Sequence, residues 1–235
     1  MKYSLKYLIA AVLGISAFSC EKDNYAPPNA MLSGNLLYNS DTIYVEKNSV
    51  HFQIYQYGFG RVGPVSTDET FAQNGSYSAS LFGGDYKLIV PNGDGPFLWP
   101  KTSGGNPDSI SISMKGNQTV DLNVTPYWLI QNAQISASGS NVTASFKAAK
   151  IVTDANARDI ERVTLYINKT QFVSGGNNIA HTDLAGADIV DPNNISMSVA
   201  IPSMTPTQSY IYARVGIKLA GVEDMIFSPL FQVNF

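Results

Sequence analysis

Apolar and polar residues alternate with a period of two through most of this chain, in short runs separated by turn residues. In the first run, Val50, Phe52 and Ile54 share one face, and polar or aromatic residues occupy the positions between them. Similar runs recur at residues 86–90, 110–114, 120–124, 142–146, 163–167, 197–201, 211–217 and 231–235. Runs of this length and period are typical of half-buried antiparallel strands. The sequence therefore predicts an all-β protein with almost no helix.

The composition agrees with this fold class and excludes one class of partner. Of the 235 residues, 44% are hydrophobic and only 14% are charged, which is too little charge for long solvated helices. The formal net charge is -3, and the chain has no basic cluster. Nucleic acid is therefore not expected as a partner, because binding its phosphates requires concentrated positive charge.

The first twenty residues have the pattern of a bacterial lipoprotein signal peptide. A basic start is followed by an apolar run at residues 7–15 and by small residues that lead to Cys20, the only cysteine. A membrane-spanning helix is the alternative, but the apolar run is well short of the roughly 20 residues that a bilayer core requires. We expect cleavage before Cys20 and acylation of its thiol, which places the protein on the outer membrane as a lipid-anchored, cell-surface protein. Lipid on Cys20 leaves no thiol for a disulfide.

The chain divides into four segments on these patterns. Residues 1–19 are the predicted signal peptide, and residues 20–29 form a polar, proline-bearing tether. Residues 30–126 and 127–235 each hold a series of alternating runs, so each is expected to form one β-sandwich. The strand spacing of the second series is typical of an immunoglobulin or fibronectin III-like sandwich. The relative orientation of the two sandwiches does not follow from the sequence.

Several motifs carry a resemblance to a known family. They are Asn-Gly-Ser-Tyr at residues 74–77, Leu-Phe-Gly-Gly-Asp-Tyr-Lys at 81–87, Val-Thr-Pro-Tyr at 124–127, and the segments 166–173 and 212–216. Together they resemble an uncharacterised family of Bacteroidetes lipoproteins, over nearly the whole mature chain. The resemblance implies a first domain similar to the carboxypeptidase regulatory-like, transthyretin-like sandwich. It also implies a glycan-related role beside outer-membrane polysaccharide-uptake proteins, and it offers no catalytic residues.

The glycine- and proline-rich segment at residues 91–107 contains the first candidate binding residues. Trp99 and Phe97 lie there between prolines, which can hold a large aromatic ring rigidly. Exposed aromatic faces bind sugar rings because stacking desolvates flat apolar surface. Trp99 can instead fold back and cap the sandwich. An exposed Trp99 therefore favours glycan binding, whereas a buried one favours an interaction with a protein.

The polar face of the run at residues 50–57 supplies the second candidate. His51, Tyr55 and Tyr57 share this face and are candidate ligand-binding residues. The alternative is that the tyrosines only pack against neighbouring strands.

Catalysis, metals and cofactors find little support in the sequence. The two histidines, His51 and His181, fall in different predicted domains, and no serine lies in a nucleophile elbow. A pair of facing carboxylates remains open, because the acidic residues lie mainly in predicted turns. Residues 58–63 match a dinucleotide fingerprint formally, but no helix follows them. We therefore expect no enzyme activity, no metal and no cofactor.

These observations lead to one main functional prediction and one alternative. The main prediction is a non-catalytic surface lipoprotein that binds polysaccharide or oligosaccharide as an accessory component of glycan uptake. Membrane tethering would let weak contacts suffice, because polymer and transporter share one surface. The alternative is an architectural lipoprotein that docks onto outer-membrane uptake proteins through sheet edges or the domain junction.

Overall fold

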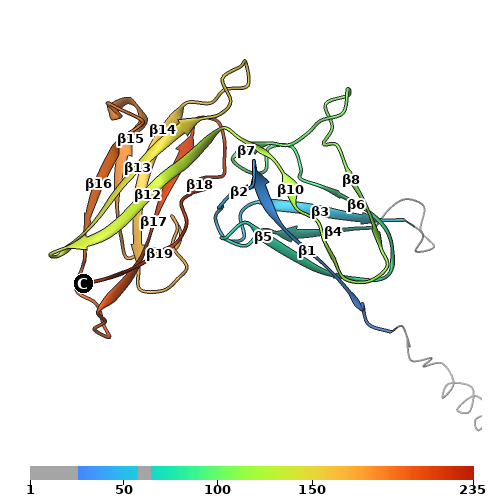
Figure 1. Ribbon diagram of the computed structural model, residues 1–235, viewed down its shortest axis with the longest axis horizontal. Coiled ribbons are helices and arrows are strands. Elements are labelled where there is room, and N and C mark those ends of the chain that lie inside the picture. The colour runs from blue at the N-terminus through green and yellow to red at the C-terminus, as the bar shows by residue number, and fades with distance from the viewer. Residues whose placement is uncertain (1–25, 58–64) are drawn as a thin grey trace, which may run out of the picture.

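The computed structural model describes residues 26–57 and 65–235, which form two β-sandwiches side by side along the long axis of the molecule (Figure 1). Nearly all regular structure is strand, and the helix found in these residues is a single 3-10 turn, η1 (Gly186–Asp188). The described chain contains no helix long and apolar enough to span a membrane. The predicted all-β tandem sandwich is confirmed. Residues 1–19, Cys20 and the motif at 58–63 lie outside the described residues.

The N-terminal sandwich pairs a sheet built around the first strand with a four-stranded sheet of order β4-β3-β6-β8. In the first sheet, β1 pairs with β2, β5, β9 and β10, and a short β7–β11 ladder lies beside it. The strands are β1 (Ala30–Tyr38), β2 (Asp41–Thr42), β3 (His51–Gln56), β4 (Val65–Thr70), β5 (Ser76–Leu81), β6 (Gly84–Ile89), β7 (Phe97–Leu98), β8 (Ile110–Met114), β9 (Gln118–Thr119), β10 (Leu122–Asn123) and β11 (Thr125–Pro126).

The core of this sandwich follows the alternation in the sequence. Phe52 and Ile54 of β3 are buried, whereas their neighbours on the other face stay partly exposed. The Phe52 ring packs against Phe71 and Tyr77 at centroid distances of 4.8 and 5.0 Å. Tyr77 also donates its hydroxyl to the Val120 carbonyl at 2.6 Å, so its polar atom is satisfied inside the core. Burial, with a smaller effect of Asp121, raises the pKa of Tyr77.

The C-terminal sandwich pairs sheet β12-β13-β16 with sheet β15-β14-β17-β18. The strands β18 and β19 both pair with β17, β19 near its start and β18 near its end. The strands are β12 (Trp128–Ser138), β13 (Asn141–Lys150), β14 (Ile160–Asn168), β15 (Ala180–Ala185), β16 (Ile195–Ala200), β17 (Tyr210–Leu219), β18 (Ile226–Phe227) and β19 (Phe231–Asn234). The register of β12 against β13 shifts between Gln131 and Gln134, where Asn132 adopts a positive φ of 53°. This bulge bends the strand close to the domain junction.

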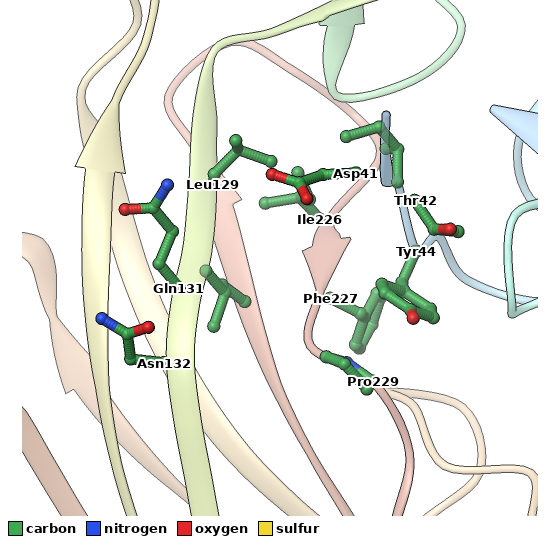
Figure 2. A pocket seen from close by; sticks show the side chains of 11 residues that line it. Asp41, Thr42, Tyr44, Leu129, Gln131, Asn132, Ile226, Phe227 and Pro229 are labelled. Atoms are coloured by element: carbon green, nitrogen blue, oxygen red, sulfur yellow. The ribbon is translucent and has the colours of Figure 1, made fainter. Parts of the chain in front are cut away.

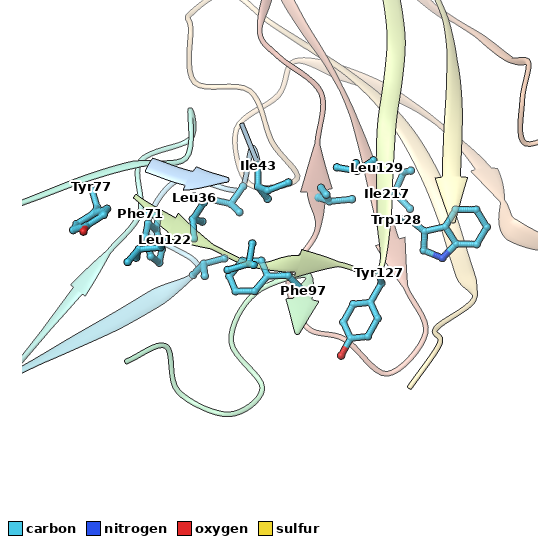
Figure 3. Packing of buried hydrophobic residues seen from close by; sticks show 14 of the residues in the cluster. Leu36, Ile43, Phe71, Tyr77, Phe97, Leu122, Tyr127, Trp128, Leu129 and Ile217 are labelled. Carbon is cyan, nitrogen blue, oxygen red and sulfur yellow. The ribbon is translucent and has the colours of Figure 1, made fainter. Parts of the chain in front are cut away.

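The two sandwiches meet through a continuous apolar contact. Leu36 and Ile43 of the N-terminal domain belong to the same buried cluster as Leu129 and Ile217 of the C-terminal domain (Figure 3). A β-bridge crosses the junction as well, with the Phe227 amide donating to the Tyr44 carbonyl at 3.0 Å. Shared core and shared backbone pairing hold the domains in one fixed orientation.

A buried arginine reinforces this junction. Arg214 of β17 is 1% exposed and lies with its guanidinium 4.3 Å from the centre of the Phe227 ring. It donates to the carbonyls of Val45 and Gln73 in one domain, at 3.3 Å each, and to that of Ser228 in the other at 3.2 Å. Desolvation lowers the pKa of Arg214 to about 10, so the side chain remains charged at neutral pH.

A buried carboxylate also links the two domains. Asp224 of the C-terminal domain accepts hydrogen bonds from the Ser49 hydroxyl and, at 2.8 Å, from the Gly95 amide. Both donors belong to the N-terminal domain. The contact also fixes the start of the loop that contains Phe97 and Trp99.

Candidate functional site

The two aromatic residues of the segment at 91–107 are folded inward, which decides between the exposed and the buried alternative that the sequence left open. Phe97 lies in β7, which pairs with β11, so its ring enters the core. Trp99 is 8% exposed, and its indole N–H donates to the Asp108 carbonyl at 2.8 Å. A tryptophan whose only polar atom has a partner can be buried at little cost. The flat faces of these two rings are therefore not available for open stacking.

The same segment nevertheless borders a hollow at the domain junction, which we term the loop pocket. It has a volume of about 210 Å³ and is lined from both domains. The lining residues are residues 91–95, residues 97–99, Lys101, Tyr127, Arg158, Gly221 and Val222. Two residues predicted from the sequence, Phe97 and Trp99, thus become the apolar wall of a pocket rather than a platform.

Two basic side chains line the loop pocket. Lys101 follows Trp99 in the N-terminal domain, and Arg158 comes from the loop between β13 and β14. The Arg158 guanidinium lies 5.8 Å from the centre of the Tyr127 ring and donates to the Ala157 carbonyl at 3.1 Å. Over the described ranges, neither Lys101 nor Arg158 forms an ion pair. Sequence analysis missed both residues, because nothing in the local pattern distinguishes them from other surface cations.

Asp94 links the loop pocket to His51, which belongs to the second candidate site predicted from the sequence. Asp94 lines the pocket, and its Oδ2 lies 3.7 Å from Nδ1 of His51 on β3. Burial raises the pKa of Asp94, and Asp224, Asp68 and Glu223 act in the same direction, while His51 opposes them. The structure therefore brings His51 to the edge of the loop that holds Phe97 and Trp99.

The two tyrosines of the second candidate lie elsewhere. Tyr55 is half-buried on β3 and donates its hydroxyl to Oε1 of Gln53 at 2.6 Å. Tyr57 follows the end of β3 and is 60% exposed. Neither lines the loop pocket. The predicted grouping of His51 with Tyr55 and Tyr57 is therefore divided between two places.

A larger groove opens on another part of the junction, and we term it the junction groove (Figure 2). Its volume is about 440 Å³, and its lining comes from residues 41–44, residues 129–132, Ile226, Phe227 and Pro229. Figure 2 shows Asp41 extending from the N-terminal domain toward Leu129 and Ile226 of the C-terminal domain. The strand β12 forms one wall and, among the described strands, pairs only with β13. Its other backbone edge is thus free to pair with an added strand.

The described residues contain no cluster of three or more histidine, cysteine or acidic side chains that could hold a metal ion. Of the carboxylates near the loop pocket, Asp224 already accepts hydrogen bonds on both oxygens. The pocket therefore offers one carboxylate, two cations and an amide beside apolar walls. Such a set can orient a small polar ligand.

Comparison with family models assigns both domains. Residues 30–125 match the model described as the N-terminal domain of a protein of unknown function, DUF3823, and residues 128–232 match its C-terminal domain, DUF3823_C. The chain belongs to the DUF3823 family. The resemblance drawn from the sequence motifs, to an uncharacterised Bacteroidetes family, is thereby confirmed. None of the curated proteins matches the chain.

Crystal structures of DUF3823 proteins share the whole architecture. One from Parabacteroides merdae is 33% identical and has a TM-score of 0.75; the match covers 89% of this chain and all of that one. Another from Bacteroides ovatus is 31% identical, with a TM-score of 0.74 and coverage of 88% and 99%. A further similar crystal structure is of a Bacteroides uniformis protein that is described as a candidate carbohydrate-binding protein. It is 15% identical, with a TM-score of 0.68 and coverage of 88% and 100%, so this likeness concerns the fold.

Proposed function

We propose that this DUF3823 protein is a non-catalytic, lipid-anchored protein of the outer-membrane surface that binds glycans in the loop pocket. It would act as an accessory component of polysaccharide capture and uptake. The observation that carries the proposal is the composition of the pocket. Apolar walls from Trp99 and Tyr127 adjoin Asn92, Asp94 and Arg158, so one hollow combines apolar surface with hydroxyl-binding groups.

The dimensions of the pocket support a small polar ligand. A volume of about 210 Å³ suits one sugar ring or the end of a chain rather than a long polymer segment. Affinity per site would be modest, since few contacts can form. Anchoring through Cys20 would compensate, because many copies on one membrane can hold a single polymer.

The rigid junction supports the same function. The pocket lies between two domains that Arg214, Asp224 and the Tyr44–Phe227 bridge hold in place. A preformed pocket binds without the entropic cost of ordering its walls. The first residues of β1 lie at the end of the N-terminal domain away from this junction (Figure 1). An anchor near that end would leave the pocket directed away from the membrane.

Two further observations agree with the proposal. The B. uniformis neighbour, described as a candidate carbohydrate-binding protein, has the same two-domain fold. In addition, Asp94 is the single carboxylate that lines the pocket among the residues the structure describes. Glycoside hydrolysis generally needs two carboxyl groups on either side of the bond, which favours binding over catalysis.

The proposal is tested by filling the pocket. Affinity electrophoresis of the whole chain in mild detergent, against a panel of neutral and acidic polysaccharides, should show retardation by at least one of them. Val222→Trp places a large ring at the pocket wall and should abolish that retardation. Val190→Trp is the matched control, because Val190 is 99% exposed and lies outside the pocket. Thermal unfolding of both variants verifies that they remain folded.

A docking role is the second candidate, and burial of Trp99 is the observation that favours it. The junction groove, with the free edge of β12 along one wall, is the surface that a partner protein would use. If no polysaccharide of the panel retards the protein, the docking role is favoured over glycan binding.

A further inference from the structure

We propose that the loop pocket selects a sugar residue that carries a carboxylate, such as a uronic acid, with Arg158 and Lys101 as its anion-binding groups. The inference deepens the proposed function and rests on it. It concerns the charge of the ligand, which neither the fold nor the family determines.

The first argument is that two of the three charged side chains lining the pocket are cations. Arg158 and Lys101 come from different domains and line the same hollow. Neither has an acidic partner within the described part of the chain. Two unpaired cations on one small hollow favour an anionic group there.

The second argument is the loss of the stacking faces. Trp99 and Tyr127 are only 8% and 9% exposed, so little aromatic surface remains for a neutral sugar ring to cover. Hydrogen bonds from a charged donor to a carboxylate are stronger than those between neutral groups. With stacking reduced, charge-assisted hydrogen bonds become the main source of affinity that this pocket can supply.

The third argument is the position of the guanidinium. One nitrogen of Arg158 donates to the Ala157 carbonyl, and the group lies 5.8 Å from the Tyr127 ring. These contacts limit its motion and leave its other N–H groups without a partner in the described part of the chain. A planar guanidinium with free donors can bind a carboxylate through two parallel hydrogen bonds. Lys101 adds a point charge from the opposite domain.

The acidic wall of the pocket is compatible with this ligand. Asp94 lies 3.7 Å from His51 Nδ1, so it has a potential counter-charge outside the pocket. A carboxylate near Asp94 would be repelled, whereas a sugar hydroxyl could donate to it. The pocket would therefore orient the ring, with the carboxylate toward Arg158 and the hydroxyls toward Asp94.

The test compares two ligands that differ only at C6, where one carries a carboxylate and the other a neutral hydroxymethyl group. A trigalacturonate and its carboxyl-reduced counterpart, which is neutral, are titrated calorimetrically into the whole chain in mild detergent. We expect binding of the acidic form, at least about tenfold weaker binding of the neutral form, and weakening of the former as salt is raised. Arg158→Gln combined with Lys101→Gln should reduce binding of the acidic form to the level of the neutral one. Lys115→Gln, an exposed lysine outside the pocket, should leave it unchanged.

The outcomes separate the inference from the proposed function. Equal binding of both forms, or acidic binding that persists in the double variant, would overturn the inference and leave glycan binding standing. Failure of both trisaccharides, while Val222→Trp abolishes retention of a neutral polysaccharide, would also overturn only the inference. Failure of every saccharide in the panel would overturn both.

Discussion

At the scale of the residue, Gly75 is constrained in two independent ways. Its φ of 76° lies in the left-handed region, and a Cβ there would come within 2.1 Å of the Ile43 carbonyl oxygen. Gly75→Ala should lower the free energy of unfolding by about 2–4 kcal/mol through strain and a backbone clash. Chemical denaturation measures the change. Gly139→Ala is the control: its φ is 58° with no atom within 4 Å, so only about 1 kcal/mol is expected.

If the two alanine variants lost the same stability, the close approach of Ile43 to the turn would contribute nothing. Both glycines share the backbone strain of a positive φ, but only Gly75 packs against Ile43. The difference between the two variants therefore measures the effect of that close contact.

Asp94 gives a prediction about pH at the same scale. Because burial raises its pKa above the ordinary value of 3.8, the folded protein binds this proton more readily than the unfolded chain. The ionised carboxylate therefore destabilises the fold above the raised pKa, and that cost disappears as pH falls toward 3.8. Asp94→Asn should be more stable than the parent at neutral pH, with a difference that vanishes on acidification. Urea unfolding between pH 3 and 7 tests this; a difference independent of pH would contradict it.

At the scale of the element, the bulge in β12 depends on Asn132. Its φ of 53° is tolerated by asparagine and glycine but costs a β-branched residue more. Asn132→Gly should change the free energy of unfolding by less than about 0.5 kcal/mol, whereas Asn132→Val should lower it by about 1–2 kcal/mol. Denaturation curves distinguish the two. Equal stability of the variants would mean that the strand can lose its bulge without cost.

At the scale of the whole molecule, Arg214 couples the two domains. Arg214→Leu should lower the free energy of unfolding by about 2–4 kcal/mol, because the carbonyls of Val45, Gln73 and Ser228 lose a buried donor. The domains should then unfold in two steps rather than one. Arg162→Leu is the matched control, since that side chain is 40% exposed and its ion pairs are 3.9 Å long. Calorimetry shows the transitions, and an unchanged single transition in Arg214→Leu would contradict the prediction.

The strands were largely predictable, because period-two alternation reports burial directly. Phe52 and Ile54 are buried as their spacing indicates, and Gly75 of the Asn74-Gly75 turn has a positive φ, as glycine allows. The candidate site was predictable only in part. Trp99 and Phe97 do line a pocket, but whether Trp99 is exposed or buried was left open by the sequence, and the structure has it buried. Burial of a loop residue depends on what covers it, and the local pattern does not contain that information.

The fold class, the tandem sandwiches and the family follow from the amino-acid sequence alone, because alternation, turn chemistry and motifs are properties of neighbouring residues. How the domains meet, and which charges face the loop pocket, emerge from the three-dimensional packing. Arg158 lies far along the chain from Trp99 and joins it through packing of the two domains. Likewise, the sequence does not distinguish Arg214 from other cations on strands. Its role follows from the carbonyls of both domains that surround it in the structure. Contacts between distant segments are set by shape and burial in three dimensions, which no short stretch of sequence records.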